Sequence, residues 1–187
     1  MSAIRTQQRY TVDEYEEMVV RGILTERDRV ELIRGEIVDK MSIGTPHSSC
    51  TRRLNWLLGN LLHERALISI QAPIRLPDSE PEPDVSVVRP RPDFYAKAHP
   101  IAEDIFLVIE VSDSSLDFDR DVKGPLYAES GIVEYWIVNL IESCLEVHRR
   151  PSPAGTYGEY HVLHSGDTVE IAALPGVSLA VADILGV

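Results

Sequence analysis

The sequence predicts a single mixed α/β domain over residues 1–187, in which helices flank a central sheet. First, 187 residues with 44% hydrophobic composition are enough for one domain with its own core. Second, segments with helical spacing of apolar residues alternate with short apolar runs typical of strands. Third, the run IFLVI at 105–109 lacks the alternation of a half-exposed strand, which indicates a strand covered on both faces.

Residues 1–45 are expected to form an N-terminal helix and a hairpin. Thr11 and Glu14 have the spacing of a capping box, which predicts an amphipathic helix that starts there and stops at Gly22. The segment 29–41, RVELIRGEIVDKM, contains two strand-like runs around Arg34-Gly35 and therefore predicts a β-hairpin.

Residues 46–150 are expected to form the core of the domain, and residues 151–187 to add C-terminal strands. A loop over 42–49 precedes a helix over 50–66, whose leucines recur at helical spacing. A proline-rich loop is expected at 89–100 and a polar loop followed by a short helix at 113–131, and Trp136 is expected to lie in the core. Strands are predicted at 67–76, 84–88, 104–112, 133–140, 143–150, 158–166 and 168–174.

Composition restricts the cellular setting and the kinds of partner. The net charge of −12 argues against binding nucleic acid through an extended basic face. Cys50 and Cys144 lack the spacing of a metal or redox pair, which favours reduced thiols. Residues 1–10 contain no apolar stretch typical of a signal peptide, and IFLVI is too short to cross a bilayer. We therefore expect a cytoplasmic protein without membrane association.

Two carboxylates occupy unusual places in the predicted strands. Asp84 heads the run VSVV, although Asp is disfavoured in strands, and Glu110 follows five apolar residues. Burial of Glu110 would raise its pKa, and a second carboxylate nearby would repel it. A divalent cation relieves both problems, and two carboxylates with a backbone carbonyl and water suit Mg²⁺. A nearby lysine, for which Lys123 is the candidate, could orient a water or stabilise charge on a phosphate.

Each of these residues also has an ordinary explanation. Asp84 could be a turn residue, Glu110 a solvated strand end and Lys123 a surface side chain.

The ordered set of segments resembles the PD-(D/E)XK phosphodiesterase superfamily. More narrowly, it resembles the Uma family of putative restriction endonucleases, formerly a domain of unknown function. The resemblance runs from about residue 10 to the end and implies a restriction-endonuclease-like fold. It rests on ELIRGEIVDKM, on PHSS before the leucine-rich helix, and on PEPDVSVV, LVIEVSDSS, DRDVKGPLYAESGIVEYWIV and LPGVSL.

The resemblance also implies roles for individual residues. Asp84 and Glu110 would be the carboxylate ligands of Mg²⁺ or Mn²⁺, and the backbone carbonyl of Val111 could add a ligand. Ser112 stands where the superfamily usually has its lysine, whereas Lys123 matches the displaced lysine of the Uma pattern.

Two further residues match the family more weakly. His47 could contact a phosphate or a water, with a loop or capping histidine as the alternative. Glu31 could complete the acidic site, with an exposed strand residue as the alternative.

The position of Lys123 depends on where its helix starts. If the helix begins near Pro125, Lys123 lies on the loop before it, because proline is tolerated only in a first turn. If the helix begins near Asp119, the side chains of Asp119 and Lys123 are one turn apart and can pair.

These residues favour a Mg²⁺-dependent phosphodiesterase that acts on nucleic acid, and the family analogy implies a homodimer. One alternative is a catalytically inactive nuclease fold that serves as a binding or assembly module, which the acidic composition and Ser112 would favour. A weaker alternative is a metal-independent glycosidase that uses the two carboxylates.

Overall fold

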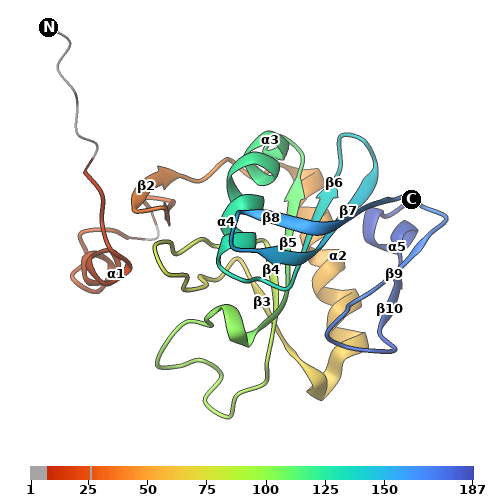
Figure 1. Cartoon of the computed structure of the whole chain (residues 1–187), viewed down its shortest axis with the longest axis horizontal. Helices are drawn as coiled ribbons and strands as arrows, with labels where there is room; N and C mark the ends of the chain where they lie inside the picture. Colours follow the sequence, from red (N-terminus) through yellow and green to blue (C-terminus); the bar gives the residue numbers. More distant parts are fainter. Residues whose placement is uncertain (1–7, 26) are drawn as a thin grey trace, which may run out of the picture.

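The expected mixed α/β architecture is confirmed by the computed structural model, which describes residues 8–25 and 27–187. Residues 1–7, which make up most of the segment expected to lack a signal peptide, lie outside this range. Figure 1 shows the central sheet, whose strands follow the order β3-β4-β5-β6-β7-β8. The strands are β3 (Leu67–Ile70), β4 (Val85–Val88), β5 (Ile105–Ser112), β6 (Glu134–Asn139), β7 (Cys144–Ser152) and β8 (Thr156–Leu163).

The central sheet is mixed, because β5 and β6 are parallel whereas the other neighbouring strands are antiparallel. The expectation for IFLVI holds, since β5 lies between β4 and β6 and is buried along nearly its whole length. Parallel neighbours need a crossover connection. Here the crossover is the helical stretch α3 (Leu116–Phe118), η3 (Asp119–Lys123) and α4 (Gly124–Glu129), which therefore packs over a face of the sheet.

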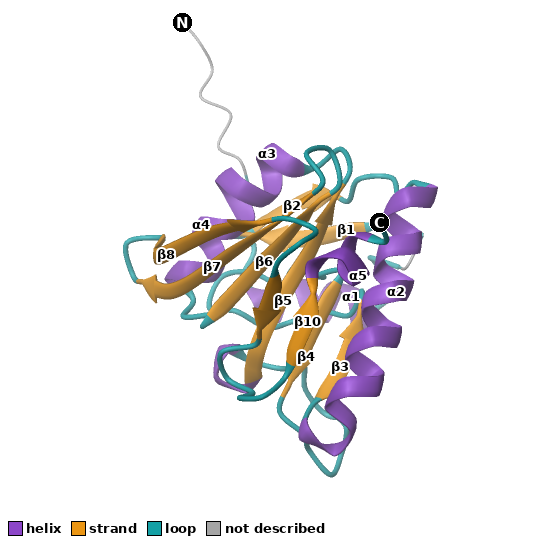
Figure 2. Ribbon diagram, turned by 90° about the vertical axis from the view of Figure 1, so that its right-hand side faces the viewer, coloured by secondary structure: helices purple, strands orange, loops and turns teal. Residues whose placement is uncertain are grey.

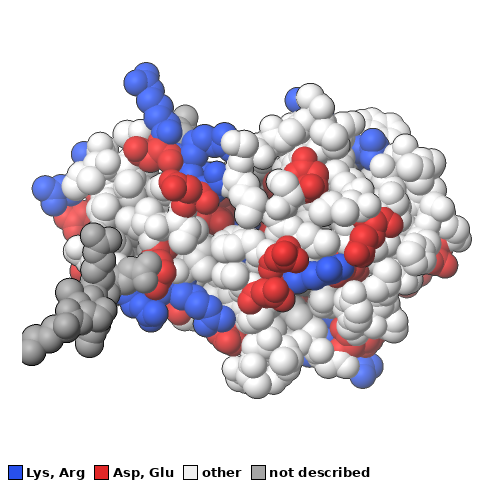
Figure 3. All heavy atoms as spheres, turned by 90° about the horizontal axis from the view of Figure 1, so that it is seen from above, with Lys and Arg blue, Asp and Glu red and all other residues white. Residues whose placement is uncertain are grey.

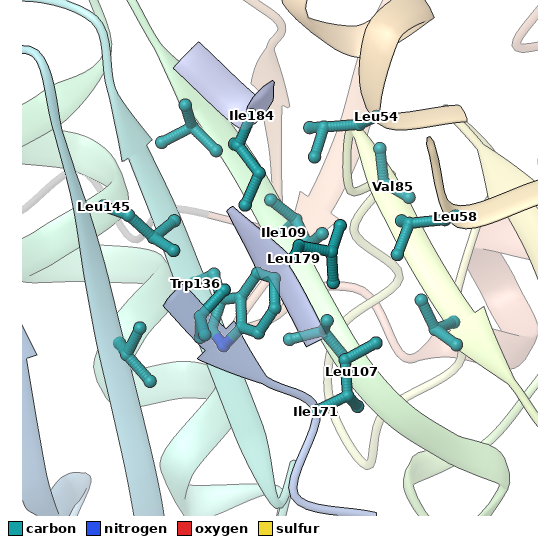
Figure 4. Close-up of a cluster of buried hydrophobic side chains, with 14 of the residues drawn as sticks. Leu54, Leu58, Val85, Leu107, Ile109, Trp136, Leu145, Ile171, Leu179 and Ile184 are labelled. Carbon is teal, nitrogen blue, oxygen red and sulfur yellow. The ribbon is translucent and has the colours of Figure 1, made fainter. Parts of the chain in front are cut away.

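The two faces of the sheet carry separate cores. On one face α2 (Thr45–Leu62) packs together with the C-terminal elements (Figure 2), and the side chains in Figure 4, with Trp136 among them, fill this layer. On the other face α3 and α4 cover a second cluster, to which Tyr127 and Tyr135 contribute. The C-terminal elements are β9 (Thr168–Glu170), β10 (Ser178–Ala180) and α5 (Val181–Leu185), and single 3-10 turns cover His63–Arg65 and Ala102–Asp104.

The N-terminal helix and hairpin form as expected. α1 (Val12–Val20) begins with the capping box of Thr11 and Glu14. β1 (Val30–Ile33) pairs with β2 (Glu36–Asp39) through the two-residue turn Arg34-Gly35. Both turn residues have positive φ, as a type I′ hairpin turn requires.

Several predicted boundaries were wrong; the strand predicted at 158–166 spans Thr156–Leu163, the strand predicted at 168–174 ends at Glu170, and two others lie next to the site. The strand expected over 67–76 ends at Ile70, because Gln71 has a φ of 48° and Pro73 follows without an N–H to donate. The helix expected at 50 begins at Thr45, with Pro46 in the first turn, where proline is tolerated. His47 therefore lies in the first turn of α2 rather than on a loop.

The helical stretch that carries Lys123 begins at Leu116, ahead of Pro125. The N–H of Gly124 donates to the carbonyl of Asp119, five residues back, which is the bond of a π-helical turn. Of the two starts considered from the sequence, the one near Pro125 was wrong. Lys123 is consequently held on a helix, and it is buried.

Among the described residues no helix combines the length and apolar character needed to cross a membrane. Cys50 and Cys144 are buried free thiols.

Candidate active site

The register of β4 against β5 brings Asp84 and Glu110 to the same level of the sheet. Val85 opposes Ile109 in this antiparallel pair. Asp84 precedes Val85 and Glu110 follows Ile109, so these two residues are level with each other. The backbone N–H of Asp84 donates to Oε2 of Glu110 at 3.3 Å. Both side chains line one pocket, and both residues are buried.

The carboxylate of Asp84 is held from two directions. Oδ2 accepts the backbone N–H of Val111 at 2.8 Å, and it lies 2.8 Å from Nε2 of His47. A carboxylate only accepts, so Nε2 of His47 is the donor. Within residues 8–25 and 27–187, Oδ1 has only a long contact, 3.4 Å, from the side-chain amide of Gln71. One oxygen of Asp84 is thus fixed, while the other has spare acceptor capacity.

The pKa of His47 depends on Asp84. Burial lowers the pKa of His47, but the hydrogen bond and negative charge of Asp84, together with Asp113 and Asp119, outweigh burial and raise it. Nδ1 of the same ring is buried and has no hydrogen-bond partner in the described part of the chain.

Glu110 is a buried carboxylate with two donors on one oxygen. Oε1 accepts from Nζ of Lys123 at 3.0 Å and from the hydroxyl of Tyr127 at 2.7 Å. Burial raises the pKa of Glu110 to about 8; Lys123 opposes this shift, and the charges of Asp84, Asp119 and Glu31 add to it. Burial is thus the main cause of the shift, and further positive charge next to Glu110 would lower this pKa.

Lys123 joins Glu110 to Glu31. Its Nζ lies 3.6 Å from Oε1 of Glu31, a residue of β1 that is buried rather than exposed. Burial lowers the pKa of Lys123, but the charges of Glu110, Glu31 and Asp119 outweigh burial and raise it. Lys123 is therefore a protonated cation at neutral pH. The other oxygen of Glu31, Oε2, accepts the backbone N–H of Glu82 at 3.0 Å.

Ser112, which occupies the usual lysine position, has a different partner. Its hydroxyl donates to Oδ2 of Asp119 at 2.6 Å, and the hydroxyl of Ser115 donates to the same oxygen at 2.5 Å. These bonds fix the carboxylate of Asp119. The ion pair expected between Asp119 and Lys123 is replaced by the pairs that Lys123 makes with Glu110 and Glu31.

The pocket has a volume of about 630 Å³, and we call it the acidic pocket because carboxylates outnumber cations along its wall. It gathers five of the residues singled out from the sequence: Glu31, His47, Asp84, Glu110 and Lys123. The side chain of Val111 points instead into the core beneath α2, so this residue can reach the pocket only through its backbone.

Several residues of the site were not predicted. Tyr127, Gln71 and the hydroxyl of Ser115 contact the acidic side chains directly. Tyr127 follows Lys123 by four residues, the helical spacing that could have identified it. Gln71 reaches Asp84 only because β3 ends before it, a break for which Pro73 was the sole signal.

The donor set fits a hard divalent cation. Oδ1 of Asp84 and Oε2 of Glu110 both have spare acceptor capacity, and both belong to side chains that line the acidic pocket. Mg²⁺ and Mn²⁺ favour oxygen donors of this kind and need few of them from the protein. The raised pKa of Glu110 indicates that additional positive charge would be favourable here.

Comparison with known proteins agrees with this description. A family model, Uma2, described as putative restriction endonuclease, matches residues 12–182. The fold is similar to that of a putative nuclease belonging to DUF820 from Anabaena variabilis, with a TM-score of 0.75 and 19% sequence identity over 95% of this chain and 98% of that chain. At this level of identity the similarity supports the fold. No curated protein was found to match the chain.

Proposed function

The chain belongs to the Uma2 family, described as putative restriction endonucleases, and from this premise we propose that it is a metal-dependent endonuclease that hydrolyses phosphodiester bonds in nucleic acid. One observation carries the proposal: Asp84 and Glu110 are level on adjacent strands in an open pocket, with Lys123 bound to Glu110 at 3.0 Å.

In this proposal Asp84 and Glu110 hold Mg²⁺ or Mn²⁺, with the backbone carbonyl of Val111 as a further ligand. When bound, the metal would supply Lewis-acid stabilisation of the charge that develops on the phosphate. Lys123 is protonated and therefore acts as an electrostatic group that orients the attacking water and the phosphate. Because a protonated lysine cannot accept a proton, Lys123 does not act as the general base.

Other residues of the pocket keep the two carboxylates in place. His47 and the N–H of Val111 fix one oxygen of Asp84, and Tyr127 fixes one oxygen of Glu110. Glu31 is the second carboxylate that pairs with Lys123. Such outer contacts orient metal ligands and are important for metal affinity.

A second candidate is an inactive nuclease fold that binds or assembles with a partner. The observation that favours it is the double ion pair of Lys123 with Glu110 and Glu31, which partly neutralises the site without a metal. Calorimetric titration with Mn²⁺ separates the two. Binding that disappears in Asp84→Ala supports the nuclease, and no binding by the wild type supports the module.

Nuclease turnover tests the proposal. Wild type, Asp84→Ala and Glu110→Ala are compared with Mg²⁺ or Mn²⁺ on single-stranded and duplex DNA and on RNA. Asp39→Asn is the matched control, because it removes an acidic charge from the wall of the same pocket without touching Asp84 or Glu110. The proposal predicts turnover in wild type and Asp39→Asn and at least a 100-fold loss in the other two. Equal turnover in all four proteins would contradict it.

We further propose that the enzyme acts as a homodimer, a proposal supported by analogy with nucleases of this fold, which often use two subunits to address two strands. Sedimentation at micromolar concentration tests this, and a purely monomeric species would contradict it.

A further inference from the structure

A second hollow adjoins the acidic pocket. It has a volume of about 230 Å³, and we call it the α2 groove. Ser48, Arg52 and Asn55 of α2 line one side of it, and Ile70 and Gln71 line the other. The two hollows share part of their walls, so the α2 groove continues from the acidic pocket along the helix. The shared residues are Ile43, His47, Ser48 and Gln71.

The two hollows differ sharply in charge. The acidic pocket contains Asp84, Glu110 and further carboxylates, whereas none of the described residues that line the α2 groove is acidic. Its cation, Arg52, is exposed and makes no ion pair within the described residues. The next residue, Arg53, instead donates to the backbone carbonyl of Ile184. In a chain with a net charge of −12, a hollow of this composition can accept a phosphate without a metal.

Basic side chains do not gather into one extended area on the face of the molecule that Figure 3 shows. Figure 3 shows acidic and basic side chains interspersed over one face, without a continuous basic area among the coloured atoms. A local site such as Arg52 is thus better suited to contact a strand than any broad electrostatic surface.

An exposed tryptophan continues the same helix face. Trp56 lies one turn beyond Arg52, beside Asn55, and is 68% exposed. The other tryptophan, Trp136, is fully buried, so the core does not account for Trp56. Gly59 follows on this face and has open space around it, so a flat ligand can lie against the indole. Exposed aromatic side chains near a cation are a common platform for unpaired bases.

We infer that the α2 groove binds a single-stranded segment of nucleic acid next to the phosphodiester held in the acidic pocket, with Arg52 on a phosphate and Trp56 stacked on a base. The claim that the bound strand leads into the acidic pocket rests on the proposed function. The claim that the α2 groove binds a single strand does not. The rise of α2 places Arg52 about 7.5 Å and Trp56 about 13.5 Å beyond His47 along the helix axis. An unpaired base is required, because a paired base does not offer its face.

The test is the affinity of the full chain for a short single-stranded oligothymidylate, in EDTA so that no cleavage occurs. Trp56→Ala is expected to weaken binding about tenfold, and Trp56→Phe to retain most of it. Arg52→Ala should lower the slope of log affinity against log salt by about 0.7. Phe94→Ala and Arg150→Ala are matched controls, because both side chains are exposed and line neither hollow. They should bind like wild type.

The inference is overturned if the wild type does not bind the strand, if the Trp56 and Arg52 variants bind like wild type, or if a duplex binds more tightly and independently of Trp56. Metal-dependent turnover measured in parallel separates this inference from the proposed function. If the Arg52 and Trp56 variants turn over substrate like the wild type, only the inference about the α2 groove is overturned. Strand binding that depends on them, without any turnover, supports the groove and overturns only the nuclease.

Discussion

Nζ of Lys123 lies 3.0 Å from Oε1 of Glu110, and both residues are buried. Lys123 is the last residue of the π-helical turn, and Glu110 lies near the end of β5. Because Glu31 approaches the same ammonium at 3.6 Å, one cation serves two buried carboxylates. Replacing that cation has consequences for both stability and metal affinity.

Lys123→Met is expected to lower the free energy of unfolding by about 3–5 kcal/mol, because it leaves buried carboxylates without their cation. Added Mn²⁺ should recover part of this loss by supplying positive charge. Lys40→Met is the control, since Lys40 pairs with Glu82 at the partly exposed rim and should cost less than about 1 kcal/mol. Denaturant unfolding with and without Mn²⁺ measures the loss of stability in each variant and its recovery by the metal. Equal stability of Lys123→Met and wild type would contradict the role of the buried pair.

Tyr127→Phe removes the 2.7 Å hydrogen bond to Glu110 while keeping the ring in the core. Above about pH 8, where Glu110 is ionised, a hydrogen bond to this charged group contributes about 1.5–3 kcal/mol, so the loss of stability measured there should lie in that range. Tyr157→Phe removes a bond to the neutral carbonyl of Ile132 and should cost only about 1 kcal/mol. Equal costs in thermal or denaturant unfolding would show that the Tyr127 bond is not charge-assisted.

His47→Ala is expected to weaken Mn²⁺ binding about 10-fold to 100-fold, because Asp84 loses the donor that orients it. Thr51→Ala is the control: Thr51 is buried on the same helix and bonds the carbonyl of His47, but it does not touch Asp84. Isothermal titration gives both dissociation constants. The same loss in both variants would indicate a general effect on α2 instead of a specific effect on Asp84.

Glu80→Gln tests a pH dependence outside the active site. Burial, with the nearby Glu16, raises the pKa of Glu80 to about 8, and its Oε2 has no hydrogen-bond partner among the described residues. The folded state therefore keeps a proton that the unfolded chain loses above pH 4.5. Stability from this group is fully present below pH 4.5 and is lost as the pH rises to about 8, by at most about 1.4 kcal/mol per pH unit.

The Glu80→Gln variant should therefore be more stable than wild type at pH 8 and depend less on pH between 5 and 8. Urea unfolding across this range measures the difference. A pH dependence identical to that of the wild type would contradict the buried, protonated Glu80.

Local patterns were sufficient to predict much of the fold. The capping box of Thr11 and Glu14, the Arg34-Gly35 turn and the unbroken apolar run of β5 each reflect a nearby physical constraint. The pairing of Asp84 with Glu110 could also be inferred locally, because a carboxylate in a buried strand is unfavourable unless it has a partner.

The remaining parts depend on interactions that are distant in sequence. A π-helical turn has no simple sequence pattern, so the burial of Lys123 against Glu31 could not be deduced from the residues around Pro125. Gln71 leaves the strand through a positive φ and thereby reaches Asp84, which the apolar pattern of 67–76 concealed. The partners of Ser112 likewise emerge only when the helical crossover folds over the sheet.

A crystal structure with Mn²⁺, located by its anomalous scattering, tests the central claim most directly. The competing location is the cluster of Glu142, Cys144 and Glu146, whose ligand atoms lie within 4.8 Å of one another, although Arg120 and Asn139 already bind its carboxylates. We predict an ion bound by both Asp84 and Glu110, and no ion in the acidic pocket of Asp84→Ala. Mn²⁺ at Glu142 and Glu146 alone, or no Mn²⁺ in the acidic pocket at saturating concentration, would contradict the proposed metal centre.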